Sequence, residues 1–356
     1  MTSAKPDSPQ VLRIIDANLN RVGEGLRILE DLARLLLNDA ALSEQLKVMR
    51  HELIRGSASF QQRLVQWRDA ESDVGVNTQV PGEEKERELA LVLVANARRV
   101  QESLRTLEET TKVSGISQEL DSEKFKQARF ELYSLEKKLL SRLLRQDKVK
   151  RVTGLYAVID TQALQGRSHV EVTRQIVRGG ARIIQLRDKV LSRKELLPIA
   201  QQLKDFCAAQ NVLFIMNDYL DLAMAVAADG LHLGQDDLPF KVARKLLPID
   251  MLLGCSVITA AQAIAAQAEG ADYVAPGAIY PTLSKESVNV VGLEVVRAVR
   301  QAVSVPVVAI GGITKENAAE VTAAGADAVA VISAILAAES PEEATRQIIN
   351  SLEARK

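Results

Sequence analysis

The feature that most constrains the fold is a change in the spacing of apolar residues near position 150. Before it, apolar side chains recur every three or four residues, as in Val22, Leu26 and Leu29, which is the period of amphipathic helices. After it, β-rich apolar runs alternate with helical stretches. A chain of 356 residues is long enough for two domains. The change therefore predicts an all-helical domain over residues 1–145 and an α/β domain over residues 151–356.

The second domain contains eight apolar runs separated by helical segments. The runs begin at Val152, Ala181, Val212, Gly230, Met251, Ala271, Val305 and Ala326. Continuous apolar strands with single helices between them are typical of a parallel sheet covered on both faces, and eight such units in about 200 residues favour a (β/α)8 TIM barrel. A doubly wound open sheet is the alternative, but its GxGxxG fingerprint does not follow the first run.

The helical domain contains an internal repeat. We expect four helices, at residues 11–37, 42–66, 84–113 and 121–145, before a charged break at 145–151. The first and third helices share the pattern Ala-Asn-x-x-Arg-Val-x-Glu-x-Leu-Arg-x-Leu-Glu. Its polar members are Asn18, Arg21, Glu24, Arg27 and Glu30 in the first copy, and Asn96, Arg99, Glu102, Arg105 and Glu108 in the second. These residues form either ion pairs on a solvated face or a polar pocket between two related helices.

Composition excludes several classes of partner. The chain has 45 basic and 46 acidic residues and no basic block, so we expect neither nucleic acid nor an anionic membrane surface as a partner. No apolar run approaches the roughly 20 residues of a membrane span. Cys207 and Cys255 lie in buried-looking contexts without a disulfide or metal motif. These observations predict a cytoplasmic protein.

Polar residues follow nearly every apolar run, where a barrel would place its active site. The second run ends in Gln185-Leu186-Arg187-Asp188-Lys189, and a loop after the sixth run carries Lys285. We expect Arg187, Lys189 and Lys285 to converge into a cationic cup that binds an anion. For each residue alone, an ordinary surface charge is the alternative.

Two carboxylates follow adjacent runs. Asp218 and Asp237 are one strand-helix-strand step apart, so both side chains would reach the same space at the barrel mouth. Oxygen ligands without a nearby His or Cys are typical of Mg²⁺, which is bound by one or two carboxylates together with waters and substrate phosphates. The alternative is that each aspartate caps the helix that follows it.

A second anion site is expected after the last two runs. Gly311-Gly312 and Ile332-Ser333 lie where many barrels hold a phosphate through backbone N–H groups, although a tight turn without ligand is the alternative. His232 alternates with leucines and is interpreted as a polar group of the barrel interior. Because no nucleophile or catalytic base is evident, the pattern favours a reaction of phosphorylated substrates in which the leaving group departs first.

At these residues the second domain resembles the thiamine-phosphate synthase family, also called thiamine-phosphate pyrophosphorylases. The likeness runs in order from residue 152 to about 340. The matching segments are QLRDK at 185–189, MNDYLDLA at 216–223, DGLHLGQDDLP at 229–239, GCSV at 254–257, PGAIYPTLSK at 276–285, AIGGIT at 309–314 and AVISAI at 330–335.

The resemblance implies a site and a reaction. Hydroxymethylpyrimidine diphosphate would be bound by Gln185, Arg187, Lys189, Asn217, Ser256 and Lys285, with Asp218 and Asp237 on Mg²⁺. Thiazole phosphate would be bound by Thr282, Ser284, Gly312, Ile332 and Ser333, where Ser284 replaces the usual threonine of the family. Diphosphate would depart first, and the thiazole nitrogen would then attack the pyrimidine-stabilised cation. A related group of barrels, comprising a thiazole tautomerase and regulators without synthase activity, is the competing interpretation.

The helical domain resembles a family described as an alternative hydroxymethylpyrimidine phosphate kinase. The likeness rests on the two repeat helices, on Arg68-Asp69 and on Asp73-Val74-Gly75. It implies that this domain uses ATP to make the diphosphate that the barrel consumes. No GxxxxGK[ST] loop occurs in residues 1–150, so a structural or dimerisation module is the alternative. The oligomeric state stays open.

Overall fold

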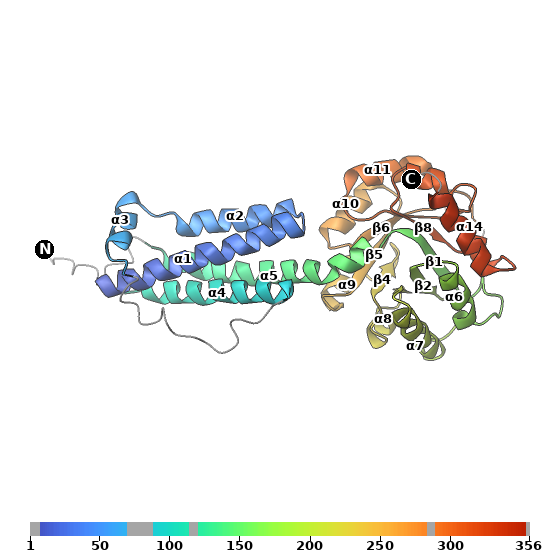
Figure 1. Ribbon diagram of the computed structural model, residues 1–356, viewed down its shortest axis with the longest axis horizontal. Helices are drawn as coiled ribbons and strands as arrows, with labels where there is room; N and C mark the ends of the chain where they lie inside the picture. Colours follow the sequence, from blue (N-terminus) through green and yellow to red (C-terminus); the bar gives the residue numbers. More distant parts are fainter. Residues whose placement is uncertain (1–7, 70–87, 114–119, 283–288, 354–356) are drawn as a thin grey trace. The chain divides into compact units, whose positions relative to one another are not determined.

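The computed structural model describes residues 8–69, 88–113, 120–282 and 289–353. Contacts divide the chain into two compact units, Met1–Leu144 and Arg145–Lys356. Each unit has its own hydrophobic core (Figure 1). Among the described residues, no helix is long and apolar enough to cross a membrane.

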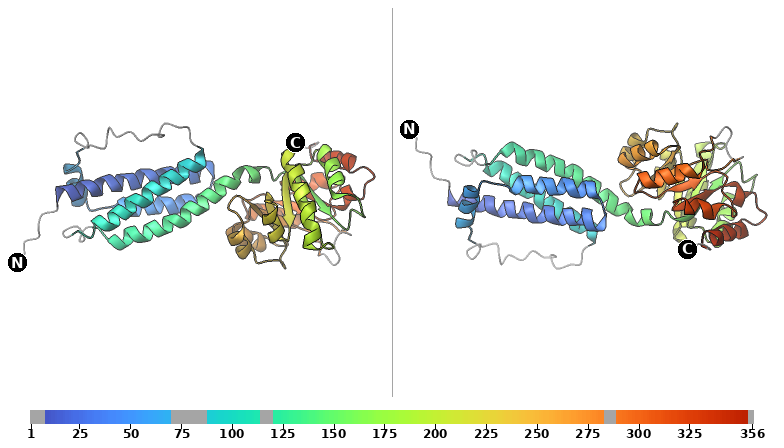
Figure 2. Two further views of the ribbon diagram at one scale, coloured as in Figure 1. Left: turned by 90° about the horizontal axis from the view of Figure 1, so that it is seen from below. Right: turned by 90° about the horizontal axis from the view of Figure 1, so that it is seen from above.

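The first unit is helical, as expected. Its elements are α1 (Pro9–Asp31), the π-helical segment η1 (Leu32–Leu36), α2 (Ala40–Ile54), α3 (Ala58–Gln66), α4 (Leu89–Thr110) and the greater part of α5 (Ser122–Lys150). Helices α1 and α4 lie side by side in both views of Figure 2. A Cβ on Gly25 of α1 would lie 2.4 Å from Cγ2 of Val100 on α4. The missing side chain at Gly25 therefore permits this close approach.

Two helix boundaries differ from expectation. The single helix expected at 42–66 is divided into α2 and α3, because the chain turns at Gly56 and the Ser57 hydroxyl accepts a hydrogen bond from the Phe60 N–H (3.2 Å), which starts a new helix. The charged break expected at 145–151 is wrong, because α5 continues to Lys150. Most residues of that segment are good helix formers, and no glycine or proline occurs between Arg145 and Gly154.

The repeat in the sequence is also a repeat in the structure. Buried Glu30 on α1 pairs with Arg50 on α2 at 2.9 Å, and Glu108 on α4 pairs in the same way with Arg129 on α5 at 3.0 Å. The hairpins α1–α2 and α4–α5 are therefore two copies of one helical unit.

The second unit is the expected barrel, and the open-sheet alternative is wrong. Its parallel strands follow the order β6-β5-β4-β3-β2-β1-β8-β7, and bridges Val274↔Val307 and Gly277↔Ile310 join β6 to β7. The strands are β1 (Gly154–Asp160), β2 (Ile183–Arg187), β3 (Leu213–Asn217), β4 (Gly230–Leu233), β5 (Leu252–Val257), β6 (Tyr273–Pro276), β7 (Val308–Ile310) and β8 (Ala328–Val331).

Alternating strand residues build two apolar layers. One set, including Tyr156, Ile183 and Leu213, fills the barrel interior, while the other, including Ile184 and Phe214, packs in the layer that contains the outer helices. The outer helices are α6 (His169–Arg178), α7 (Arg193–Ala209), α8 (Leu220–Ala225), α9 (Phe240–Leu246), α10 (Ala260–Ala268), α11 (Gly292–Ala302), α12 (Ala318–Ala323), α13 (Ser333–Leu336) and α14 (Pro341–Glu353). The parallel order leaves all eight carboxyl strand ends on one face.

Candidate functional site

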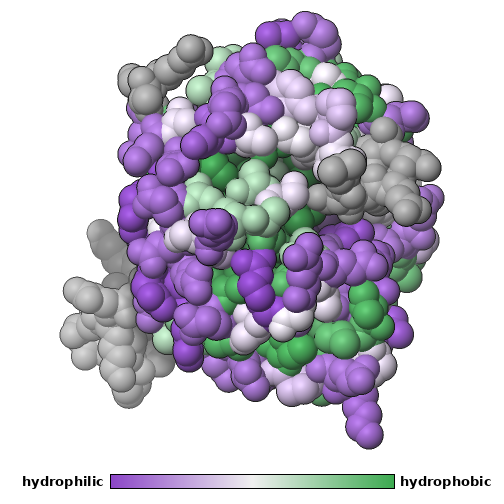
Figure 3. Space-filling model, turned by 90° about the vertical axis from the view of Figure 1, so that its right-hand side faces the viewer, coloured by the Kyte–Doolittle hydropathy of each residue, from purple (hydrophilic) through white to green (hydrophobic). Residues whose placement is uncertain are grey.

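The carboxyl ends of the strands meet at a hollow mouth. In the space-filling view of Figure 3, hydrophobic residues lie at the centre of this hollow and hydrophilic residues crowd its rim. Parallel strands of a barrel place successive strand ends next to one another. The polar residues predicted from the run ends can therefore meet there although they are far apart in sequence.

Three charged groups meet at the ends of β2, β3 and β4. The Lys189 ammonium donates a hydrogen bond to Oδ2 of Asp218 at 2.5 Å, and the Asp218 and Asp237 carboxyl groups share a hydrogen bond. The Gly234 N–H also donates to Asp237, at 2.7 Å. Strand β2 ends at Arg187, so Lys189 reaches this cluster from the loop rather than from the strand predicted to carry it.

The protonation of the pair follows from its surroundings. Burial raises the pKa of Asp218, and the hydrogen bond with Asp237 raises it further. Burial also opposes ionisation of Asp237, but hydrogen bonds from Asp218 and Gly234 outweigh it and lower its pKa. The hydrogen bond to Asp218 outweighs burial at Lys189 and raises the pKa of that ammonium. Two neighbouring carboxyl groups that disfavour each other's ionisation, with one ammonium beside them, indicate a place that a second cation could occupy.

The donor set fits a hard divalent cation. The described residues contain no cluster of three or more His, Cys, Asp or Glu side chains able to hold a metal, so Asp218 and Asp237 would supply two carboxylates and leave the other positions to water and ligand oxygens. That is the coordination typical of Mg²⁺. The capping alternative is wrong, because Tyr219 and Pro239 occupy the N-cap positions of α8 and α9.

Two acidic residues of the mouth were not singled out from the sequence. Asp160, at the end of β1, forms an ion pair with Arg187 and accepts a hydrogen bond from the Ala163 N–H. Asp188 is 1% exposed, and its Oδ1 accepts from the N–H groups of Val190 and Leu191. Asp160 could have been found because it follows the first apolar run as the other site residues follow theirs.

A chain of hydrogen bonds crosses the barrel interior below the mouth. Gln185 donates to the Tyr156 hydroxyl at 2.8 Å, the Tyr156 and Tyr273 hydroxyls are 3.0 Å apart, and Nδ1 of His232 lies 3.1 Å from the Tyr273 hydroxyl. Nε2 of His232 lies 3.0 Å from Oγ of Ser256. His232 is thus the interior polar group that was expected. The neighbouring Asn217 is paired in register with His232.

The structure describes part of the predicted second anion site. A Cβ on Gly312 would lie 2.5 Å from the Pro281 carbonyl oxygen, so this glycine brings the β7 turn against the loop that carries Thr282. Gly312 has φ +64°, which glycine adopts without strain. Ile332 and Ser333 follow β8 at the start of α13. The predicted residues Ser284 and Lys285 lie outside the described residues.

The repeated polar residues of the helical unit divide into two groups. Arg27 pairs with Glu30 and Asp31, and Arg105 pairs in the same way with Glu108 and Glu109. For these arginines, the ion pairs expected on a helix face are present. Asn18 and Asn96 each donate to a backbone carbonyl one turn earlier, at Ile14 and Val92. Arg21, Glu24, Arg99 and Glu102 are exposed, as are Arg27 and Arg105.

Two cavities open on the helical unit. The first, of about 700 Å³, lies near the start of α1 and is lined by Asn18 and Arg21 together with Arg13, Asp16 and Arg68. The predicted closing turn at Asp73-Val74-Gly75 falls outside the described residues.

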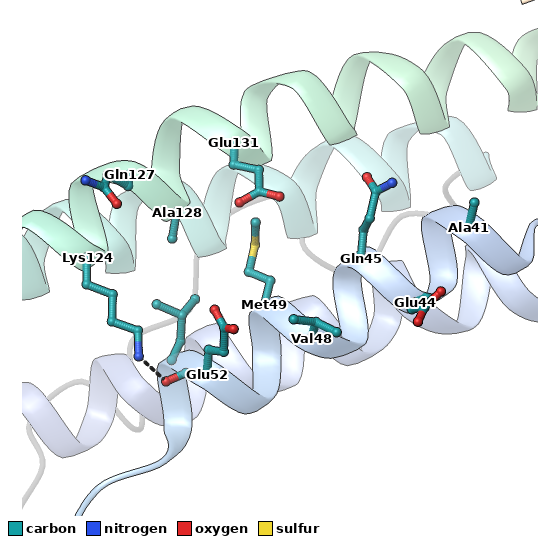
Figure 4. Close-up of a pocket in the computed structure, with 11 residues that line it drawn as sticks. Ala41, Glu44, Gln45, Val48, Met49, Glu52, Lys124, Gln127, Ala128 and Glu131 are labelled. Atoms are coloured by element: carbon teal, nitrogen blue, oxygen red, sulfur yellow. Dashed lines mark hydrogen bonds between the residues drawn. The ribbon is translucent and has the colours of Figure 1, made fainter. Parts of the chain in front are cut away.

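The second cavity, of about 460 Å³, lies between α2 and α5 (Figure 4). Its charged lining residues are Glu44, Glu52, Glu131 and Lys124, and the Lys124 ammonium donates to the Glu52 carbonyl oxygen at 2.7 Å. Three carboxylates against one ammonium would repel a phosphorylated ligand.

The fold and the mouth define a class of protein: a (β/α)8-barrel enzyme whose active face carries paired carboxylates beside basic side chains. Comparison with known proteins gives the family. A family model described as thiamine monophosphate synthase matches residues 155–335, and the model of the ThiD2 family matches residues 13–138.

Individual relatives agree with these matches. A thiamine-phosphate synthase of Thermosynechococcus vestitus is 38% identical over 346 residues, covering 97% of this chain and 96% of the relative. A thiamine-phosphate synthase of Methanospirillum hungatei is 45% identical over 195 residues, covering 54% of this chain and 95% of its own. The solved thiamine phosphate pyrophosphorylase of Pyrococcus furiosus superposes with a TM-score of 0.53 at 37% identity, covering 58% of this chain and 98% of that one.

The chain belongs to the thiamine-phosphate synthase family, and its N-terminal unit to the ThiD2 family. It is therefore a transferase of thiamine biosynthesis, as the residues of the second domain had indicated.

Proposed function

We propose that the barrel joins hydroxymethylpyrimidine diphosphate to thiazole phosphate, releasing diphosphate and forming thiamine phosphate. The observation that supports this proposal is the meeting of Lys189, Asp218 and Asp237 at three adjacent strand ends. A barrel that binds only a thiazole would not need such a cluster. A diphosphate, in contrast, needs both basic side chains and a metal ion to balance its charge. Family membership points to the same reaction.

The pyrimidine diphosphate would lie over β2 to β5. In this proposal Arg187, Lys189 and Lys285 contact the diphosphate oxygens, and Gln185, Asn217 and Ser256 hold the pyrimidine. Mg²⁺ bound by Asp218 and Asp237 would neutralise charge on the diphosphate oxygens. Lys189 already lies against Asp218, so the same ammonium can contact both the carboxylate and a phosphate oxygen bound beside it.

The reaction requires no base from the protein. The C–O bond to diphosphate breaks and its electron pair leaves with diphosphate, after which the thiazole nitrogen donates its lone pair to the same carbon. The chain's task is to stabilise departing negative charge and to hold the nitrogen in line. The hydrogen bonds from Gln185 through Tyr156 and Tyr273 to His232 and Ser256 would fix two of the three pyrimidine contacts, Gln185 and Ser256, before substrate arrives.

The thiazole phosphate would lie on the opposite side of the mouth. Gly312 packs against the loop that precedes Thr282, so backbone N–H groups of the β7 and β8 turns can face one phosphate together with Thr282 and Ser284. Ile332 and Ser333 complete this set.

Because Cys207 and Cys255 are free thiols, we place the reaction in the cytoplasm.

A direct assay tests the barrel reaction. The full chain receives hydroxymethylpyrimidine diphosphate, thiazole phosphate and Mg²⁺, and thiamine phosphate is quantified after oxidation to fluorescent thiochrome. We expect product that depends on both substrates and disappears when Mg²⁺ is chelated. No product with both substrates and Mg²⁺ present would refute the proposal, and undiminished product after chelation would refute the metal assignment.

We further propose that the helical unit phosphorylates hydroxymethylpyrimidine phosphate with ATP. Membership of the ThiD2 family and the polar cavity beside the repeat support this proposal. Its product would be the substrate of the barrel. Supplying the full chain with ATP, Mg²⁺, hydroxymethylpyrimidine phosphate and thiazole phosphate should therefore yield thiamine phosphate. Product only from the ready-made diphosphate would leave the synthase and exclude the kinase.

A further inference from the structure

The cavity at the start of α1 differs from the cavity between α2 and α5 in the charges that line it. Three guanidinium groups, of Arg13, Arg21 and Arg68, face two carboxylates, of Asp16 and Asp69. Its volume of about 700 Å³ falls within the roughly 300–1,000 Å³ usual for small-molecule sites. It can therefore admit a compact anion.

One of these arginines is held in place by a buried acid. Arg68 donates to Asp16 through Nε at 2.7 Å and through a terminal nitrogen at 2.8 Å, and Asp16 is only 7% exposed. The Arg68 side chain is still 49% exposed, so part of the guanidinium remains accessible. A two-point contact of this kind fixes the plane of the guanidinium.

A second arginine is available for a ligand. Arg21 is exposed, lines the cavity and makes no ion pair with any described residue. Arg13 contacts Asp69 through the backbone oxygen at 3.0 Å and through the carboxylate at 3.7 Å. Arg21 and Arg68 together offer the pair of planar donors that a phosphate monoester accepts most readily.

The internal repeat supplies a comparison within the same chain. In the second copy, Leu91 and Val94 occupy the positions of Arg13 and Asp16, while Arg99 occupies that of Arg21. Helix α4 thus forms with apolar residues where α1 carries the charged pair. Packing of the helical hairpin does not require Asp16, and burying its carboxylate costs desolvation free energy. The packing that the two copies share therefore does not need the charges of Arg13 and Asp16.

We infer that this cavity binds a phosphorylated small heterocycle, with its phosphate on Arg21 and on the Arg68 guanidinium that Asp16 orients. The inference rests on the proposed kinase function, for which it names the residues of the acceptor site. Asn18, Asn20 and Thr106 line the same cavity and supply amide and hydroxyl groups for ring nitrogens. Arg21 and Arg68 are binding residues, and Asp16 is a positioning residue.

The position of the single tryptophan makes the inference testable in the full chain. Trp67 ends α3 and immediately precedes Arg68, and the barrel contains no tryptophan. Fluorescence of Trp67 therefore reports on this cavity and not on phosphates bound by the barrel. We expect a saturable change on titration with hydroxymethylpyrimidine phosphate, excited at the red edge of tryptophan absorption.

Variants assign the change to the proposed residues. Arg21→Ala should weaken the binding by roughly tenfold to a hundredfold, the effect of losing one charge-assisted hydrogen bond. Asp16→Val, which copies the residue of the second repeat, should weaken it similarly by releasing Arg68. The matched control is Arg99→Ala, which removes the equivalent arginine of the other copy and should leave the binding unchanged. Circular dichroism checks that each variant keeps its helices.

The outcomes separate the site from the function. A fluorescence change that appears with ATP and not with the monoester would overturn the ligand assignment. Equal weakening by Arg99→Ala and Arg21→Ala, or no saturable change with any probe, would overturn the site. Kinase turnover that is undiminished in Arg21→Ala would also overturn the site while leaving the kinase proposal standing. Intact, Arg21-dependent binding without turnover would support the site and refute the kinase.

Discussion

At the scale of single residues, Asp218 combines a charge with an unusual backbone. Its φ of +61° lies in the left-handed region, where Asn and Asp are tolerated better than other residues with a side chain. The hydrogen bond from its N–H to the His232 carbonyl oxygen, at 2.9 Å, holds it there at the edge of β4. Replacing Asp218 by alanine would change both charge and backbone strain.

Asp218→Asn isolates the charge. We expect synthase turnover to fall by about a hundredfold or more, the usual effect of losing one electrostatic contact to the transition state. The unfolding temperature should change by no more than about 4 °C, because the Lys189 side chain of this ion pair is 46% exposed, so solvent screens the pair and limits its contribution to about 1 kcal/mol or less. Turnover and thermal unfolding are measured on the same preparation. Asp221→Asn, on the neighbouring exposed ion pair with Arg193, is the control and should stay fully active.

The two thiols should be inert in the folded protein. Burial raises the pKa of Cys207 to about 12 and that of Cys255 to about 11, so the reactive thiolate forms only as the pH approaches these values. At a pH of about 8, we expect no reaction with a thiol reagent in the native state and two equivalents after denaturation. Rapid native labelling at that pH would show that one of these buried positions opens readily.

Some site residues could be predicted from single positions and others could not. Lys189, Asp218 and Asp237 follow apolar runs, and the rule that strand ends meet in a barrel was enough to bring them together. Tyr156 and Tyr273 lie inside apolar runs, where a tyrosine looks like any core aromatic. Only the closed arrangement of the strands, in which β5 pairs with β4 and β6 and β1 pairs with β2, brings the two hydroxyls together.

At the scale of elements, the interior hydrogen bonds connect strands that are distant in sequence. Tyr273 on β6 contacts both Tyr156 on β1 and His232 on β4, and His232 stacks on the Tyr273 ring at 5.6 Å. Burial raises the pKa of both tyrosines, so the hydroxyls keep their protons and act as hydrogen-bond donors. The Tyr273 hydroxyl is therefore the junction through which Gln185 and Ser256 are aligned.

Tyr273→Phe removes this junction without changing the ring. We expect the free energy of unfolding to fall by roughly 1–3 kcal/mol, because buried polar partners lose a hydrogen bond. Beyond any loss of folded protein, synthase kcat/KM should fall about tenfold. Most of this fall should appear as a higher KM for the pyrimidine diphosphate, because Gln185 and Ser256 lose their alignment. Tyr133→Phe, on an exposed tyrosine of α5, is the control. Unaltered KM in Tyr273→Phe would assign the network to stability only.

Element boundaries were predicted less well than element types. All eight strands were expected from apolar runs, because a parallel sheet covered on both faces gives the strongest local pattern. The continuation of α5 to Lys150 was not expected, because segment 145–151 looks like a solvated linker when each residue is considered alone. Its contacts explain the difference, since Arg145 is 5% exposed and bound to Asp272. A long-range ion pair of this kind has no signature in local sequence.

At the scale of the whole molecule, the chain combines two units with separate cores and complementary proposed reactions. The helical unit would make the diphosphate that the barrel consumes. Relatives that match only the barrel exist, such as the Methanospirillum hungatei synthase, which the chain covers to 95% of its length. The barrel fold therefore does not depend on a helical unit in that relative. In this chain, the question is where an independent barrel must begin.

The contacts of the end of α5 indicate that the barrel unit begins at Arg145. The Arg145 Nε donates to Asp272 at 2.7 Å, a second nitrogen donates to the Ile249 carbonyl oxygen at 2.7 Å, and Val149 packs on the interior core. Asp272 also accepts from the Leu253 N–H at 2.8 Å and is 7% exposed. Removing Arg145 would take away one cationic partner of the buried Asp272 carboxylate. Fully breaking a buried ion pair lowers the free energy of unfolding by roughly 3–5 kcal/mol.

Two truncated chains test this boundary. Residues 143–356 should fold and keep synthase turnover within about twofold of the full chain, because every contact of the barrel mouth is retained. Residues 151–356, the boundary expected from the sequence alone, should be less stable by about 3 kcal/mol, since Arg244 at 3.3 Å still compensates Asp272 in part. Urea unfolding of both fragments measures the difference. Equal stability would show that the end of α5 contributes nothing to the barrel, and an inactive but folded 143–356 fragment would show that the synthase needs the helical unit.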